Sequence, residues 1–253
     1  MTVIAVTMVK NELDVIETTI RHMAAHVDHV IVADNGSTDG TRDVLETLPC
    51  ETLDDPDPAY YQSFKMTRLA HYAGAQGADW VVPFDADEIW LPATETTIAE
   101  QLRRSGGNVA PAWLYDHVVT TADLVGIAPQ QAMTYRMRER SKLHKVAARY
   151  ISGMVIEMGN HQVTYPKNQK VRIDWDVLQV RHYPIRSPRQ FARKARQGSA
   201  ALALTDLPDD IGRHWRDWGE LSDTQLHHVF SAHWRYTTDD PRIMYDPARL
   251  SGI

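Results

Sequence analysis

Three short apolar segments, each followed at once by polar residues, constrain the fold of this chain more than any other feature. They cover residues 3–8, 29–33 and 80–84 and are almost continuously apolar, as expected for strands buried on both faces of a parallel sheet. Between them, apolar residues recur at helical spacing in segments 13–27 and 62–75. This alternation predicts an α/β fold with a Rossmann-like, mostly parallel central sheet flanked by helices.

Polar clusters stand at the end of each predicted strand. In an open parallel sheet, ligands bind at the carboxyl ends of the strands, so these clusters are expected to meet at one edge and to border a ligand. The residues concerned are Val9, Asn11 and Glu12 after the first strand, Asp34 and Asn35 after the second, and Asp85, Ala86, Asp87 and Glu88 after the third.

Helix-capping patterns predict several further boundaries. Asn11 is expected to cap the first helix, and Ser37 or Thr38 to begin a short helix that Pro49 closes. Capping boxes predict helices from residues 97–100, 187–190 and 222–225. Strand-like runs are expected at residues 109–115, 146–151, 154–158 and 177–183.

The predicted organisation is one large domain with a helical extension. Residues 1–105 are expected to form a donor-binding half that includes the Asp-x-Asp motif, and residues 106–205 an acceptor-binding and catalytic half. Residues 206–253 are expected to form a C-terminal helical segment. Three tryptophans there, Trp215, Trp218 and Trp234, are interpreted first as packing residues, with an acceptor groove as the alternative.

Charge, cysteine content and hydropathy exclude several classes. The 253 residues carry a formal net charge of −6 with basic residues spread throughout, which does not favour a nucleic-acid partner. A single cysteine, Cys50, excludes an intramolecular disulfide framework and fits a reducing compartment. No apolar run approaches the ~20 residues of a spanning helix. A cytoplasmic protein is expected, with peripheral membrane contact left open.

Asp85 and Asp87 carry the main chemical signal. Two carboxylates two residues apart at the exit of a buried strand suit Mg²⁺ or Mn²⁺, which prefer oxygen ligands and leave positions open for substrate phosphates. The alternative interpretation is a solvated acidic turn. The preceding apolar strand and the following Glu88-Ile89-Trp90 favour the metal interpretation.

At these residues the chain resembles the family 2 glycosyltransferases, in a bacterial branch with an Asp-x-Asp-Glu motif. The matching stretches are residues 6–12, 32–41 and 80–90, and the likeness resumes over residues 182–198. The resemblance implies a GT-A fold and a nucleoside-diphosphate sugar as donor. It also implies an acceptor hydroxyl on a glycan, a lipid-linked molecule or a small molecule, and inversion at the anomeric carbon.

The resemblance also implies roles for individual residues. Asp34 would bind the base, while Val9, Asn11, Glu12 and Asn35 would border the nucleotide. Asp85 and Ala86 would face the ribose or the metal, Asp87 would bind the metal, and Glu88 would orient a neighbouring group. His182 is a further candidate metal ligand, with a core or capping histidine as the alternative. The candidates for the diphosphate are Arg68 and Lys194, alongside Lys65, Lys142, Lys145 and Arg186.

The general base is the least determined role. Many relatives use an acidic residue in a downstream loop, and this sequence departs from that pattern. His161, which follows a glycine turn, is the first candidate, with Glu157 and Asp116 as runners-up.

Two other functions stay open at this point. A sugar nucleotidyltransferase would also use a nucleotide, a metal and carboxylates, but residues 9–12 lack the glycines of its phosphate loop. A catalytically inactive binding or scaffold protein with the same fold is the second alternative.

Overall fold

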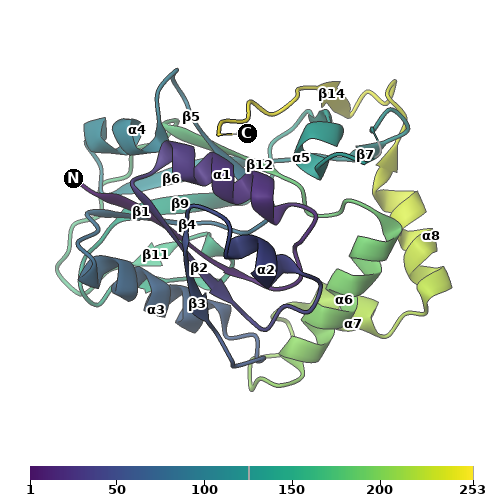
Figure 1. The fold of residues 1–253 in the computed structure, drawn as a ribbon, viewed down its shortest axis with the longest axis horizontal. Helices are drawn as coiled ribbons and strands as arrows, with labels where there is room; N and C mark the ends of the chain where they lie inside the picture. Colours follow the sequence, from purple (N-terminus) through teal and green to yellow (C-terminus); the bar gives the residue numbers. More distant parts are fainter. Residues whose placement is uncertain (125, 253) are drawn as a thin grey trace.

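The computed structural model describes residues 1–124 and 126–252 and is built on one eight-stranded sheet (Figure 1). The strand order is β3-β2-β1-β4-β9-β6-β12-β5. In chain order these strands are β1 (Val3–Val9), β2 (His29–Asp34), β3 (Glu51–Asp54), β4 (Trp80–Pro83), β5 (Glu88–Pro92), β6 (Val109–Asp116), β9 (His144–Arg149) and β12 (Leu178–His182).

The sheet is mostly parallel, as the sequence predicts. β1 pairs in parallel with β2 and β4, β2 with β3, and β6 with β12. β9 runs antiparallel between β4 and β6, and β5 is antiparallel to β12. The prediction of an α/β fold with a central sheet flanked by helices is therefore confirmed.

Helices cover both faces of the sheet and one end of it (Figure 1). Helices α1 (Ile16–His26) and α4 (Ile98–Arg104) contribute to the apolar core on one face, and α3 (Gln62–Ala75) to the core on the other. At one end lie α6 (Pro188–Leu202), α7 (Arg213–Gly219) and α8 (Asp223–His233). The short elements are α2 (Thr41–Leu45), α5 (Pro129–Ala132), a 3₁₀ turn η1 (Met158–Asn160), and strands β7 (Val119–Thr120), β8 (Tyr135–Met137), β10 (Val155–Ile156), β11 (Val163–Thr164), β13 (Arg235–Tyr236) and β14 (Ile243–Tyr245).

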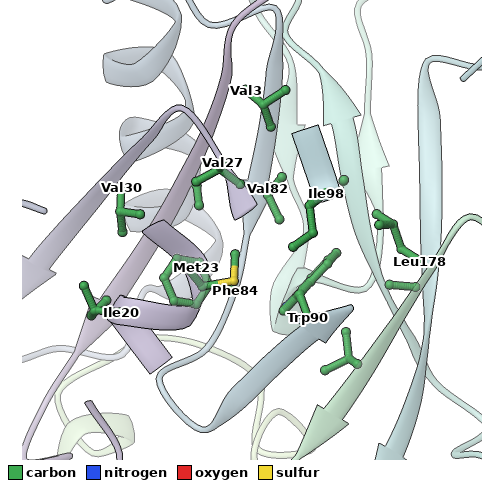
Figure 2. Close-up of a cluster of buried hydrophobic side chains, with 14 of the residues drawn as sticks. Val3, Ile20, Met23, Val27, Val30, Val82, Phe84, Trp90, Ile98 and Leu178 are labelled. Atoms are coloured by element: carbon green, nitrogen blue, oxygen red, sulfur yellow. The ribbon is translucent and has the colours of Figure 1, made fainter. Parts of the chain in front are cut away.

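The central strands alternate their side chains between two apolar cores. Trp80, Val82 and Phe84 face the side of α1 and α4, whereas Val81 belongs to the core under α3. Figure 2 shows the first of these cores, where Val82, Phe84 and Trp90 pack with residues of α1, α4 and β12. Burial on both faces explains why these strands read as continuous apolar runs.

The C-terminal helices form a separate apolar cluster. Phe191 of α6 and Phe230 of α8 are buried in it, and Trp215, Trp218 and Trp234 pack partly buried against them. The interpretation of these tryptophans as packing residues is confirmed, although Trp215 also lines the cleft described below.

Some predicted helix starts are wrong. Asn11 does not cap the first helix, because α1 begins at Ile16 and its N-cap, Val15, makes no side-chain cap. The short helix α2 begins at Thr41, after Gly40 in a left-handed conformation, and not at Ser37. Both corrections have one cause. The polar residues after β1 form hydrogen bonds with the polar residues after β2, across the edge of the sheet, and do not cap the helix that follows β1.

The later caps and strands follow the sequence more closely. Capping boxes at Thr97 and Ser222 are present. Ser187 caps α6 through the Gln190 amide, but the Gln190 side chain accepts from Arg186 N and the box is not closed. The strand expected at residues 154–158 shortens to β10, and β3 and β5 were not predicted. In the described part of the chain, no helix is long and apolar enough to span a membrane.

Candidate active site

A cleft of about 490 Å³ opens at the carboxyl ends of the parallel strands. It is bordered by the ends of β1, β4, β6 and β12, by residues 58–62 and 141–145, and by the inner face of α6. Of the residues proposed from sequence, those that line it are Val9, Glu12, Asn35, Asp85, Ala86, Asp87, Asp116, Lys145, His161, His182 and Lys194. The fold thus brings together residues from eight separate segments.

Asp87 lies buried among cationic side chains. Lys194 Nζ is 2.5 Å from Asp87 Oδ2, and Arg186 Nη1 lies 3.7 Å from the same oxygen. His182 Nε2 is 3.7 Å from Asp87 Oδ1. Burial opposes ionisation of this carboxyl, but the charges of Lys194, His182 and Arg186 outweigh it and hold the pKa of Asp87 well below its usual range. Asp87 is therefore a carboxylate at neutral pH.

Asp85 is held by a different set of partners. Its Oδ2 accepts from Lys145 Nζ at 2.5 Å and its Oδ1 from Asn160 Nδ2 at 3.0 Å. Lys145 also lies 2.8 Å from Glu88 Oε1. Burial opposes the charge of Lys145, yet Asp85 and Glu88 together raise its pKa above the usual value, so it stays cationic.

Glu88 lies behind the cleft and does not line it. Its side chain is fully buried, and Oε2 accepts from Asp85 N at 3.1 Å and from Trp90 Nε1 at 3.0 Å. Burial raises the pKa of Glu88, opposed by Lys145. These contacts fix the backbone of the acidic turn and place Lys145, which makes Glu88 a positioning residue and not one that touches the substrate.

His182 is oriented by Asp116. Its Nδ1 lies 2.7 Å from Asp116 Oδ1, which leaves Nε2 facing Asp87. Burial lowers the pKa of this imidazole, but the carboxylates of Asp87 and Asp116 outweigh burial and raise it. The register of β12 against β6 pairs His182 with Asp116 directly, so the sheet itself assembles this pair.

His161 borders the cleft, and a hydrogen bond at one ring nitrogen sets its tautomer. Its Nδ1 donates to the carbonyl oxygen of His144 at 2.7 Å, so in the neutral ring Nε2 carries the lone pair. Burial and the nearby charge of Lys145 lower the pKa of His161. Of the two alternatives for the base, Asp116 lines the cleft, whereas Glu157 does not and accepts from Thr164.

The side chains at this site are of types that bind a divalent metal. They are not arranged as a complete set of ligands. Asp87 Oδ1 and His182 Nε2 face each other, and carboxylate with imidazole suits Mn²⁺. The third expected ligand, Asp85, is directed toward Lys145 and Asn160. Accordingly, within residues 1–124 and 126–252 no group of three His, Cys, Asp or Glu side chains is placed to hold a metal ion.

Three other predicted residues lie off the cleft wall. Asn11 adopts φ +56° and bridges the site, since its Oδ1 accepts from Thr38 N at 2.7 Å and its Nδ2 donates to Gln197 Oε1 at 2.6 Å. Asp34 is buried, with Oδ2 accepting from Ser37 N and Oδ1 making no hydrogen bond. Arg68 is exposed on α3, its guanidinium 5.7 Å from the centre of the Phe64 ring, so a contact with the diphosphate is not supported.

The tertiary structure also brings to the site residues that the sequence did not single out. Lys145 was one basic candidate among many, and only the pairing of β9 beside β4 sets it against Asp85. Tyr60 also lines the cleft, and burial with the charge of Asp85 raises its pKa to about 12. Gln62 accepts from Gly159 N at 2.8 Å and so ties α3 to the turn before His161. No local pattern in the sequence marks these three contacts.

An open, mostly parallel sheet with an acidic turn and two lysines in a cleft at its carboxyl edge defines an α/β protein with a ligand-binding cleft. The chain belongs to glycosyl transferase family 2, whose model matches residues 4–157. The sheet and the helices that flank it form a GT-A type fold. The family model ends just before Asn160 and His161 and excludes His182 and Lys194.

Similar solved structures cover less of the chain. One is glucosyl-3-phosphoglycerate synthase from Mycobacterium tuberculosis in complex with phosphoglyceric acid, at 23% identity and TM-score 0.33, covering 45% of this chain and 44% of that one. The same enzyme with Mn²⁺ and UDP-glucose gives 23% identity and TM-score 0.33, with coverages of 45% and 43%. A mycobacterial protein gives 22% and 0.34, with coverages of 46% and 41%.

The chain thus spans less than half the length of these proteins. Their low TM-scores support no inference about its substrates. A comparison with curated proteins gives no match.

Proposed function

We propose that this enzyme transfers a sugar from a nucleoside-diphosphate sugar to an acceptor hydroxyl, with inversion at the anomeric carbon. In this reaction the acceptor oxygen loses its proton to a base and bonds to the anomeric carbon. The bond from that carbon to the β-phosphate oxygen breaks, and the nucleoside diphosphate leaves with the electron pair. The donor is assigned to residues 1–105, the acceptor and the base to residues 106–205, and residues 206–253 form the helical extension.

The observation that carries the proposal is the ring of cations around the acidic turn. Lys145 and Lys194 border the cleft, each holding one carboxylate of the Asp-x-Asp motif, and Arg186 lies behind Asp87. A departing diphosphate gains negative charge as its bond to the sugar breaks. Ammonium groups held in place beside the leaving group stabilise that charge without the reorganisation that water requires. Lys194 and Lys145 are proposed for this role.

The nucleoside is proposed to lie between the ends of β1 and β2. Val9, Glu12 and Asn35 line that part of the cleft. Asn35 Nδ2 donates a hydrogen bond to Asp55 Oδ2 at 2.9 Å and so holds the loop that follows β3. Asp34 precedes Asn35 in the chain, and its buried Oδ1, which has no hydrogen-bond partner among the described residues, is proposed to accept from the base.

A divalent ion, Mn²⁺ or Mg²⁺, is proposed to be held by Asp87 and His182, with Asp85 as the third ligand. When bound, it would add positive charge at the diphosphate. The orientation of His182 by Asp116 serves this role, because a hydrogen bond at Nδ1 directs Nε2 to the ligand position.

His161 is proposed as the general base. Its lowered pKa keeps the ring neutral at pH 7, and the bond from Nδ1 to His144 O holds the tautomer in which Nε2 accepts a proton. Asp116 is the second candidate, because it borders the same cleft. Leu114 and Leu143 line the part of the cleft that is proposed to bind the acceptor substrate. These apolar side chains offer no hydrogen bond that would compete with the base for the attacking hydroxyl.

Calorimetric titration with UDP, GDP and dTDP, each with Mn²⁺ and with a chelator, tests the donor site. We expect one nucleoside diphosphate to bind, and Asp87→Asn to weaken its binding, whereas Arg189→Gln, an exposed change on α6, leaves it unaltered. No binding of any diphosphate to a folded sample would favour the scaffold interpretation. Release of pyrophosphate from a nucleoside triphosphate and a sugar phosphate would favour a nucleotidyltransferase.

A further inference from the structure

Two exposed segments beside the cleft form a basic and apolar surface, defined here as residues 138–144 and 166–175. Six of the 27 Lys and Arg residues of the chain lie in these segments, against Glu139 and Asp174 among its 33 acidic residues. The whole chain has a net charge of −6, so this surface is strongly positive on an otherwise acidic protein. The basic residues are Arg138, Arg140, Lys142, Lys167, Lys170 and Arg172.

Aromatic contacts join the two segments into one surface. The Arg140 guanidinium lies 3.4 Å from the centre of the Trp113 ring. Trp113 stacks on Trp175 with ring centres 4.7 Å apart, and Trp175 meets His144 at 5.2 Å. Residues from the loop before β9 and from the strand-like segment 171–175 therefore meet across Trp113.

Large apolar side chains project from this surface. Val171, Ile173 and Trp175 are 51%, 52% and 40% exposed, and Leu143 is 52% exposed. Val171, Ile173 and Trp175 alternate in an extended segment that bridges to Val109, so the three side chains point to the same side. A row of exposed apolar residues beside unpaired cations has little purpose on a surface that meets only water.

The three lysines of this surface are available to meet a partner, whereas Arg138, Arg140 and Arg172 contact neighbouring residues. Within residues 1–124 and 126–252, the ammonium groups of Lys142, Lys167 and Lys170 take part in no ion pair. Asp174, the acidic neighbour of the apolar row, is bonded to Ser105 Oγ at 2.6 Å and faces inward.

We propose that this surface docks the enzyme on an anionic lipid bilayer. Lys and Arg attract anionic headgroups, while Val171, Ile173, Leu143 and Trp175 enter the boundary between headgroups and acyl chains. A nucleic acid or a polyanionic glycan would use the same cations but would gain nothing from exposed aliphatic residues. Ser141 and Leu143 also line the cleft, so a bilayer on this surface lies next to its acceptor side. The proposal does not depend on the proposed function, because it concerns binding alone.

Sedimentation of the full chain with vesicles tests the proposal. The vesicles are phosphatidylcholine alone or phosphatidylcholine mixed with phosphatidylglycerol. We expect binding only to the mixed vesicles, weakened by added salt. Replacing Lys142 and Lys170 together with alanine should lower the partition constant about 25-fold, since each basic residue contributes roughly five-fold.

The apolar row is tested separately. Val171→Ser with Ile173→Ser should reduce vesicle binding without changing binding to heparin, which carries charge but no acyl chains. The matched control is Leu204→Ser, because Leu204 is 57% exposed on another part of the molecule. Absence of binding to the mixed vesicles would overturn the proposal. Equal loss of heparin and vesicle binding in the alanine variant, with no effect of the serine changes, would show a polyanion site and also overturn it.

Discussion

Lys194 of α6 and Asp87 of the turn after β4 meet at 2.5 Å across the floor of the cleft, although 107 residues separate them in sequence. Lys194 Nζ lies also within 3.4 Å of Pro184 O, so the ammonium group is held from two sides. Asp87 carries its negative charge because this lysine, His182 and Arg186 outweigh its burial. We propose that this pair fixes a cation where the leaving diphosphate gains charge.

Lys194→Gln is expected to lower kcat/KM on the order of 100-fold, because a fixed cation aimed at developing charge is lost. Steady-state kinetics with the donor identified by calorimetry measure the change. Arg189→Gln, an exposed change on α6 outside the cleft, is the matched control and should leave the rate near that of the parent. Unchanged kinetics in Lys194→Gln would remove this residue from the site.

His161→Gln should lower kcat by roughly 10²- to 10⁴-fold if His161 is the base. Burial and Lys145 lower the pKa of His161 from 6.5, so the parent enzyme should lose activity as the pH falls below that value. The pH–rate profile of His161→Gln should lack this loss of activity at low pH, the acid limb of the profile. If Asp116→Asn removes the limb and His161→Gln retains it, the base is Asp116.

Stability should fall at mildly acidic pH because of two buried histidines. His117 Nδ1 donates to Met133 O at 2.7 Å and His22 Nε2 donates to Trp90 O at 2.7 Å. Burial lowers the pKa of each from 6.5 to about 4. The unfolded chain therefore binds more protons between these values, and stability present above pH 6.5 is lost as the pH falls toward 4.

Each histidine contributes up to roughly 3 kcal/mol to this loss. Urea unfolding at several pH values between 7.5 and 4.5 measures it. His117→Phe should flatten the dependence, and the exposed His228→Asn should not. A parent protein as stable at pH 4.5 as at pH 7.5 would contradict the assignment of both rings.

Gly74→Ala should destabilise the protein, although alanine is the better helix former. A Cβ at Gly74, inside α3, would come within 2.1 Å of the Tyr150 ring, and the resulting displacement costs about 1–3 kcal/mol. Gly106→Ala is the control, since a Cβ there meets nothing within 4 Å and its φ is not in the left-handed region. Thermal unfolding of both variants measures the effect. A lower Tm for Gly74→Ala than for the parent indicates that packing against Tyr150 dominates, and a higher Tm indicates that helix propensity dominates.

The sequence determined the layout of the sheet edge. The apolar runs that became β1, β2 and β4 predicted a parallel sheet, and the carboxyl-end rule placed Asn35, Asp85 and Asp87 together before any contact was known. These strands could be predicted because a strand buried on both faces is almost continuously apolar, and this pattern is visible within the segment itself.

Only the tertiary structure decided which partners these residues take. β9 inserts antiparallel between β4 and β6, and this pairing sets Lys145 against Asp85. Likewise, Asn11 bonds to Thr38 and Gln197 and does not cap α1. Strand order and long-range hydrogen bonds depend on segments distant in the chain, and helical or strand periodicity within one segment carries no record of them.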